Sequence, residues 1–238
     1  MWRSLFSRSN LCIPEGIDKQ AARRHYEIEK DYAARIMHSP KNSKERLELF
    51  EEGYKKITEI LLEYSGMEQF GAQPHEALAI DRMLEGKKDA AIFDVGFGRG
   101  GTLRNLAAMG YTNLYGVDIS CNNQAELLNH FEKEFREAFH PERFCVSDFL
   151  TFEKPSEMPA FDLVCCSNVM EHFHPDDAPD AMKKIFDMLK PGGAAFLIVP
   201  NRLYGPSDVS GYYLPTGAVA TGFHLKEYLV REMVQLYT

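Results

Sequence analysis

The sequence predicts a three-layer α/β domain preceded by a helical N-terminal extension. Short apolar runs of strand length recur between residues 90 and 199, and stretches of helical periodicity separate them. The first third of the chain contains no such run. Strands that alternate with helices form a mostly parallel sheet joined by crossover helices. Several runs are apolar almost throughout, as strands covered on both faces are.

The N-terminal part is predicted to be helical. Helices are expected over residues 15–38 and 42–65, because apolar side chains recur there every three or four residues. Pro40 separates the two, since proline disfavours a helical residue before it. A third helix is expected over residues 75–84, ending before Gly86.

The sheet region supplies the remaining elements. Strands are expected over residues 90–95, 113–118, 143–147, 161–166 and 194–199. Helices are expected over residues 101–109, 120–139, 177–190 and 225–236. We therefore divide the chain into an extension or lid, residues 1–73, and a ligand-binding domain, residues 74–238.

Composition excludes several classes of protein. With 238 residues, 27 Lys plus Arg and 35 Asp plus Glu, the net charge is −8, which argues against a general nucleic-acid binder. No apolar run approaches the ~20 residues that a bilayer span needs. The five cysteines include no C-x-x-C pair, so reduced thiols in a cytoplasmic protein are expected. The N-terminus lacks the apolar core of a secretory signal, although its composition leaves a transit peptide open.

A glycine-rich segment follows the first predicted strand. Gly96, Gly98 and Gly101 fit G-x-G-x-x-G, which lets a ligand approach the backbone at a helix N-terminus. Asp118 ends the second strand, 22 residues after Gly96, where a carboxylate accepts ribose hydroxyls. Asp118 could instead cap the next helix, for which Ser120 is the better residue. These residues indicate a nicotinamide or flavin dinucleotide or another adenosine cofactor.

Over about residues 74–200 the chain resembles the class I S-adenosylmethionine (SAM)-dependent methyltransferases. Residues 94–100 resemble the family's acidic-x-G-x-G-x-G motif and residues 115–120 its second motif. Residues 147–149 are similar to its adenine-side motif, residues 161–172 to its fourth strand and following loop, and residues 189–193 to its next turn. The dehydrogenase alternative lacks the last two.

The resemblance implies a Rossmann-like methyltransferase fold with strand order 3-2-1-4-5 and SAM as cofactor. It implies that Gly96, Gly98 and Gly100 line the methionine part, that Asp94 lies near its amino group and that Asp118 holds the ribose. It further places Ile119 and Phe149 around the adenine, Asp148 at the adenine edge and Asn168 beside the cofactor. Core packing is the alternative for Ile119 and Phe149, and a turn for Asp148.

The loop after the fourth strand lies where ligands bind in such sheets. A hydroxyl or protonated amine acceptor needs a base, and the ordinary pKa of histidine suits that role. We therefore predict His172 and Asn168 as catalytic residues, with packing at a helix start as the alternative for His172. Residue 168 does not begin N-P-P-Y, which argues against a nucleic-acid base as acceptor.

Glu171-His172 also resembles the E-x-x-E-H motif with which methyltransferases of ubiquinone biosynthesis and of small-RNA 3′ ends hold a divalent metal. Here Asn168 stands in place of the first glutamate, so one ligand of that motif is missing. We therefore predict no bound metal and keep metal dependence as the alternative.

A long irregular stretch follows the fifth strand, and such loops are usually functional. We expect residues 201–223 to form a substrate-facing flap with Tyr204, Tyr212, Tyr213 and His224 as contacts, or a surface loop whose tyrosines pack. The resemblance implies that the extension caps the cleft through Tyr26, Tyr32 or Tyr54, although core packing also explains them.

The family's sheet usually ends in an antiparallel hairpin, and this chain stops at Thr238 before one could begin. The fifth strand is therefore expected at an open edge, covered by the 201–223 loop or by a second copy in a homodimer.

The sequence thus predicts an enzyme that moves a methyl group from SAM to oxygen or nitrogen of a small molecule (class 2.1.1). The alternatives are a protein or RNA methyltransferase, and a truncated or degenerate SAM-binding protein without catalysis.

Overall fold

The computed structural model describes residues 13, 15, 17–61 and 74–237 and divides the chain into two compact units. Of the described residues, the sheet unit comprises 74–169 and 180–198. The helical unit comprises 13, 15, 17–61, 170–179 and 199–237. Residues 199–237 thus group with the N-terminal helices, and the functional division at residues 73 and 74 stays a prediction.

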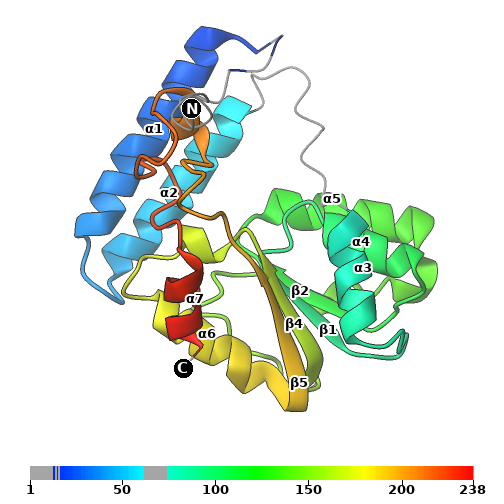
Figure 1. The fold of residues 1–238 in the computed structure, drawn as a ribbon. Helices are drawn as coiled ribbons and strands as arrows, with labels where there is room; N and C mark the ends of the chain where they lie inside the picture. Colours follow the sequence, from blue (N-terminus) through cyan, green and yellow to red (C-terminus); the bar gives the residue numbers. More distant parts are fainter. Residues whose placement is uncertain (1–12, 14, 16, 62–73, 238) are drawn as a thin grey trace, which may run out of the picture. The chain divides into compact units, whose positions relative to one another are not determined.

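The sheet unit contains five parallel strands in the order β3-β2-β1-β4-β5 (Figure 1). The strands are β1 (Ile92–Val95), β2 (Leu114–Asp118), β3 (Phe144–Val146), β4 (Phe161–Ser167) and β5 (Leu189–Ile198). The predicted fold class and the order 3-2-1-4-5 are therefore confirmed.

Helices cover both faces of this sheet. They are α3 (Pro74–Met83), α4 (Gly101–Ala108), α5 (Cys121–Glu134) and α6 (Ala178–Met188). Figure 1 shows α3, α4 and α5 on one side and α6 on the other. On the first side Ile80, Leu106 and Phe131 are fully buried in one apolar cluster. On the other face the ring of Phe93 lies 5.0 Å from that of Phe161.

The last two elements differ from their predicted bounds. Strand β5 begins five residues early because Phe161 pairs with Leu189 and Leu163 with Ala194, so the predicted turn is a bulge inside the strand. The final helix, α7 (Val230–Leu236), is shorter than the expected 225–236. Its start is fixed by Glu232 Oε2, which accepts from the amide of Leu229 at 2.8 Å.

Strand β5 lies at the edge of the sheet, and the described residues contain no sixth strand. Its residues are half-buried or exposed along their whole length. Coverage of this edge by the 201–223 loop or by a second copy stays a prediction.

The helical unit is built on α1 (Lys19–His38) and α2 (Lys44–Leu61). Asp18 caps α1 by accepting from the amide of Gln20 at 2.8 Å. Residues 62–65 of the expected second helix lie outside the described residues. Ile36, Phe50 and Phe223 are buried in a shared apolar cluster, so the C-terminal segment packs on the two N-terminal helices. None of the described helices combines the length and apolar character that a bilayer crossing requires.

A buried ion pair ties α2 to the segment before α6. Arg46 Nη1 donates to Asp177 Oδ2 at 2.7 Å, and Arg46 Nε donates to Ser39 Oγ at 3.0 Å. The side chains of Arg46 and Asp177 are 4% and 3% exposed. Removing one partner of such a pair leaves the other charge buried and unpaired.

We expect Arg46→Ala to lower the free energy of unfolding by roughly 3–5 kcal/mol, measured by urea denaturation. The matched control is Arg35→Ala, since Arg35 pairs with Asp31 at 3.5 Å while both side chains are about half exposed or more. That control should cost no more than about 1 kcal/mol. Equal losses in both variants would contradict a structural role for the buried pair.

Candidate functional site

The glycine segment between β1 and α4 adopts a left-handed backbone at three positions. Gly96, Gly98 and Gly100 have φ angles of 66°, 53° and 77°, which glycine adopts without strain. A Cβ on Gly96 would lie 2.5 Å from Val169, and one on Gly100 would lie 2.1 Å from Leu127. A Cβ on Gly98 would meet nothing within 4 Å. Gly98 therefore borders open space, where a ligand can approach the backbone.

Asp118 lies beside this segment at the end of β2. Its Oδ2 accepts from the amide of Gly98 at 2.8 Å, and its Oδ1 accepts from the amide of Ser120 at 2.8 Å and from Asn123 Nδ2 at 3.0 Å. Burial raises the pKa of Asp118, and these hydrogen bonds oppose the rise. Ser120 is the N-cap of α5, as predicted. The bonds fix the carboxylate next to the glycine segment.

Two further buried carboxylates gather near Asp118. Asp94 is 4% exposed and accepts from the Cys165 thiol at 3.2 Å. Burial raises the pKa of Asp94 to about 7, and Glu76 and Asp118 add to the rise although the thiol opposes it. Glu76, in α3, is 6% exposed and accepts from the Thr102 hydroxyl at 2.8 Å. This end of the sheet therefore carries negative charge suited to a cation.

Glu76 is not among the site residues that the sequence predicted. It stands four residues before Ile80, on the buried face of α3, and upstream of every motif. An acidic residue at an apolar position of the helix was the only signal.

The three residues predicted to lie around the adenine are Ile119, Asp148 and Phe149. Phe149 is buried, Ile119 is half-buried, and Lys184 Nζ lies 5.4 Å from the ring centre of Phe149. Asp148 Oδ1 accepts from the amide of Leu150 at 2.8 Å, so that oxygen serves its own turn. The cofactor roles of these three predicted residues stay predictions.

Asn168 occupies a strained position just after β4. Its φ is 54°, a left-handed value that costs energy in any residue but glycine, least in Asn and Asp. Its amide donates to the carbonyl of Ile198 at 2.9 Å, and its Nδ2 lies 3.3 Å from Ser167 Oγ. The side chain is exposed. Its predicted roles in catalysis and cofactor binding stay predictions.

The residues of the sheet unit fit the cofactor implied by the resemblance. SAM carries an ammonium and a sulfonium group, and Asp94 with Glu76 offers buried negative charge. It also carries ribose hydroxyls, for which Asp118 is the predicted acceptor at the end of β2. Gly98 leaves room for close approach of a ligand.

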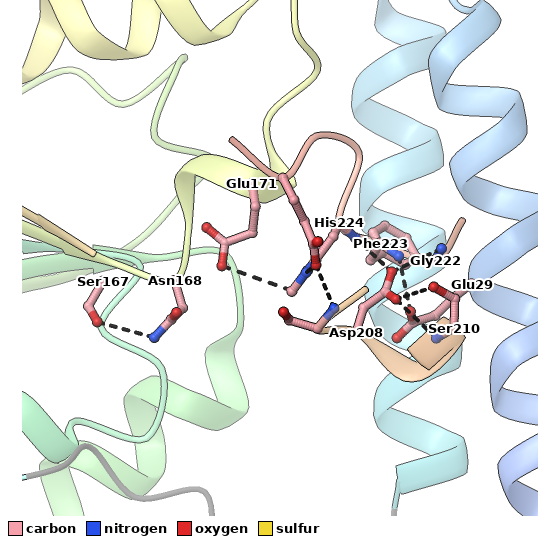
Figure 2. Close-up of polar contacts among 11 residues, drawn as sticks. Glu29, Ser167, Asn168, Glu171, Asp208, Ser210, Gly222, Phe223 and His224 are labelled. Atoms are coloured by element: carbon pink, nitrogen blue, oxygen red, sulfur yellow. Dashed lines mark hydrogen bonds and ion pairs between the residues drawn. The ribbon is translucent and has the colours of Figure 1, made fainter. Parts of the chain in front are cut away.

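A second cluster of ionisable side chains lies in the helical unit (Figure 2). Glu171 is fully buried, and neither carboxylate oxygen has a hydrogen-bond partner among the described residues. Burial raises the pKa of Glu171 to about 7, although His224 opposes the rise. His224 Nε2 lies 3.9 Å from Glu171 Oε1, and Figure 2 shows the two side chains facing each other.

The two histidines of this cluster differ in their surroundings. Burial and the neighbouring His224 lower the pKa of His172 to about 3, so its ring is neutral. Burial lowers the pKa of His224, but the hydrogen bond of its Nδ1 with Glu227 Oε1 at 2.9 Å and the nearby Glu171 raise it on balance. The catalytic role of His172 stays a prediction.

Several tyrosines predicted to face substrate pack inside the helical unit. The ring of Tyr26 stacks on that of Tyr213 at 4.7 Å, and Tyr54 lies 5.2 Å from Phe223. Tyr32 packs against the cluster around Phe223. Tyr204 is 76% exposed, and Tyr212 is half-buried. Packing thus accounts for four of these tyrosines, namely Tyr26, Tyr32, Tyr54 and Tyr213. The predicted substrate contacts stay predictions.

The known proteins that this chain resembles are methyltransferases. A family model described as a methyltransferase domain matches residues 73–237. The chain is 28% identical over 128 residues to phosphoethanolamine N-methyltransferase 2 of Caenorhabditis elegans, covering 53% of this chain and 27% of that protein. It is 27% identical over 121 residues to the mitochondrial ubiquinone biosynthesis O-methyltransferase of Dictyostelium discoideum, covering 48% and 36%. The chain therefore spans only about a third of these relatives or less.

A solved structure shares the fold. The YcgJ protein of Bacillus subtilis superimposes with a TM-score of 0.51 at 17% identity, covering 69% of this chain and 67% of that one. At this identity the likeness concerns the fold alone.

We expect Gly98→Ala to weaken SAM binding at least tenfold in calorimetry, because the new methyl group enters the open space beside the backbone. The variant should remain folded, since the strain at its positive φ is about 1–2 kcal/mol. Gly110→Ala is the matched control, with φ of 91° and nothing within 4 Å of the added Cβ. It should lose similar stability and keep its SAM affinity. Unchanged affinity in Gly98→Ala would contradict a ligand at this position.

The pKa of Asp94 predicts a pH dependence of stability. Its folded pKa of about 7 exceeds the ordinary aspartate pKa of 3.8, so between these values the folded state holds a proton that the unfolded state lacks. This contribution is complete below about pH 4 and is lost as the pH rises through about 7, by up to about 1.4 kcal/mol per pH unit.

Asp94→Asn removes this titration, so the variant should gain stability relative to the wild type as the pH rises from 4 to 8. Urea denaturation across this range measures the difference. A constant difference for Asp94→Asn would show that Asp94 titrates normally.

Proposed function

The chain belongs to the methyltransferase-domain family of class I SAM-dependent methyltransferases, and on this basis we propose that it transfers the methyl group of SAM to oxygen or nitrogen of a small molecule. The observation that carries the proposal is the pair formed by Asp118 and Gly98. A buried carboxylate at the end of β2 accepts from the amide of a left-handed glycine that borders open space.

SAM supplies an activated methyl group, because its sulfonium is a good leaving group. The residues of this chain bind and orient it. Asp94 and Glu76 offer negative charge to its cationic groups, and Asp118 is assigned to the ribose. Gly96 and Gly100 leave room for Val169 and Leu127, which would collide with a side chain at either position.

A small-molecule acceptor is supported by the kinds of relatives. One relative is named for N-methylation of phosphoethanolamine and another for an O-methylation in ubiquinone biosynthesis. The net charge of −8 argues against RNA. The chain covers only a part of each relative, so the acceptor is proposed as a class.

His172 and Asn168 are retained as proposed catalytic residues. His172 comes from the short helix η3 (Met170–His172), which follows β4 within two residues. A hydroxyl or a protonated amine needs a base within reach, and His172 would act as a weak base because burial and His224 lower its pKa to about 3.

The function is tested with the full chain and methyl-labelled SAM. We expect saturable SAM binding with Kd near 1 μM, about −8 kcal/mol. After incubation with a fractionated cell extract, the label should appear in the small-molecule fraction. Label in protein or RNA would favour the corresponding alternative, and binding without any transfer would favour a non-catalytic SAM-binding protein. Absence of SAM binding would reject the proposal.

Asp118→Asn should weaken SAM binding at least tenfold, because an amide group cannot accept from the ribose hydroxyls as a carboxylate does. Calorimetry measures the affinity, and circular dichroism verifies the fold. Asp148→Asn is the matched comparison, with a smaller expected effect because Asp148 Oδ1 already serves its own turn. If both variants bind SAM like the wild type, the assignment of the ribose to Asp118 is wrong.

A further inference from the structure

We propose that Glu171, His172 and His224 bind a divalent transition-metal ion of the Zn²⁺ class. One ligand atom from each residue lies within 4.8 Å of the others. All three residues belong to the helical unit. From the sequence we predicted no metal, because Asn168 stands in place of the first glutamate of the E-x-x-E-H motif. The structure brings in His224 from a segment more than fifty residues away.

Glu171 is 0% exposed, and neither of its carboxylate oxygens has a hydrogen-bond partner among the described residues. A buried carboxylate without partners is costly. The hydroxyl of the nearby Tyr228 is also buried without a partner. A cation is the missing partner that would balance this charge.

The two imidazole rings offer nitrogen ligands. Nδ1 of His172 is buried without a hydrogen-bond partner among the described residues, and a neutral imidazole has one ring nitrogen with a free lone pair. Nδ1 of His224 is held by Glu227 Oε1 at 2.9 Å, which turns Nε2 toward Glu171. Metal-ligating histidines are usually oriented by such outer partners.

Hydrogen bonds hold the segment that carries His224 in place. Asp208 Oδ2 accepts from the amides of Gly222 at 3.0 Å and His224 at 3.3 Å, and Glu29 Oε2 accepts from the amide of Phe223 at 3.0 Å. Figure 2 shows these carboxylates around the segment. The amide of Lys226 donates to the carbonyl of Glu171 at 3.1 Å, joining the two ligand-bearing segments. The ligands are thus presented by a rigid arrangement.

The donor set selects the class of ion. Two imidazole nitrogens and one carboxylate suit Zn²⁺, Fe²⁺ or Co²⁺, whereas Mg²⁺ and Ca²⁺ prefer oxygen. Bonds of ~2.1 Å in a tetrahedral site place ligand atoms roughly 3.4 Å apart. The 3.9 Å between Glu171 Oε1 and His224 Nε2 therefore needs to contract only slightly. A fourth position remains for water or a substrate atom.

The test uses the full chain without a histidine tag, treated with a chelator and then titrated with ZnCl₂ in a calorimeter. We expect one site with a micromolar or lower Kd and a rise in Tm when Zn²⁺ is added. MgCl₂ should give neither effect. Absence of saturable Zn²⁺ binding would overturn the proposal.

Two variants locate the site. Glu171→Gln and His224→Ala should each lower Zn²⁺ affinity at least a hundredfold. Without metal, Glu171→Gln should melt at the same temperature as the wild type or higher, because a neutral amide replaces a buried carboxylate that has no hydrogen-bond donor. Glu227→Gln should lower affinity about 10–100-fold, as an outer partner does. If Zn²⁺ binds Glu171→Gln as it binds the wild type, the site lies elsewhere and the proposal is wrong.

His130→Ala is the matched control, since His130 forms a similar pair with Glu134 at 3.1 Å on the surface. It should leave Zn²⁺ binding unchanged. Methylammonium chloride is a second probe. If it raises the Tm of the wild type but not of Glu171→Gln, and Zn²⁺ does not bind, the cluster holds an organic cation and the metal proposal is overturned.

The metal site does not depend on SAM binding, although it shares His172 with the proposed catalytic residues. SAM affinity, measured in the same Glu171→Gln protein, reports on the residues around Asp118. Lost Zn²⁺ binding with retained SAM binding therefore distinguishes the two sites, and failure of either proposal leaves the other standing.

Discussion

Each buried carboxylate in this chain needs hydrogen-bond donors or an opposite charge, and the loops of both candidate sites are arranged around that need. Removing a carboxylate from water without partners is costly. Asp118 is supplied by the amides of Gly98 and Ser120. In the other unit Asp208 and Glu29 are supplied by the amides of residues 222–224. In both units a side chain fixes the path of a loop because the loop's own N–H groups balance its charge.

Such bonds require the backbone to come close, and glycine permits this. A Cβ on Gly222 would lie 2.4 Å from Glu29 Oε2, and one on Gly53 would lie 2.5 Å from the ring of Phe223. Gly96 and Gly100 allow equally close packing beside the first motif. The glycines therefore serve two purposes: some adopt a left-handed backbone, and others simply leave out a side chain. Among Gly96, Gly98 and Gly100, Gly98 alone borders open space, which is why it is the position assigned to ligand approach.

Asp94 and Glu171 lack strong hydrogen-bond donors. Among the described residues, Asp94 accepts from a thiol alone, a weak donor, and Glu171 has no hydrogen-bond partner. Both have a pKa raised to about 7 by burial. Perturbed groups of this kind cluster at functional sites. Each unit thus has a place where a cation would restore the balance: SAM beside Asp94, and a metal ion beside Glu171.

The sequence alone determined the fold class and the residues of the glycine segment, because strand and helix periodicity and the spacing of Gly96, Gly98 and Asp118 are local properties. The strand order followed from the resemblance of its motifs to the class I methyltransferases. It did not find Glu76, which joins Asp94 only through the packing of α3, nor the partnership of Glu171 with His224. It also placed the last helix too early, since Glu232 sets its start. The tertiary structure decided these points, because the charge around a buried group depends on which distant segments fold against it, and no local pattern encodes that neighbourhood.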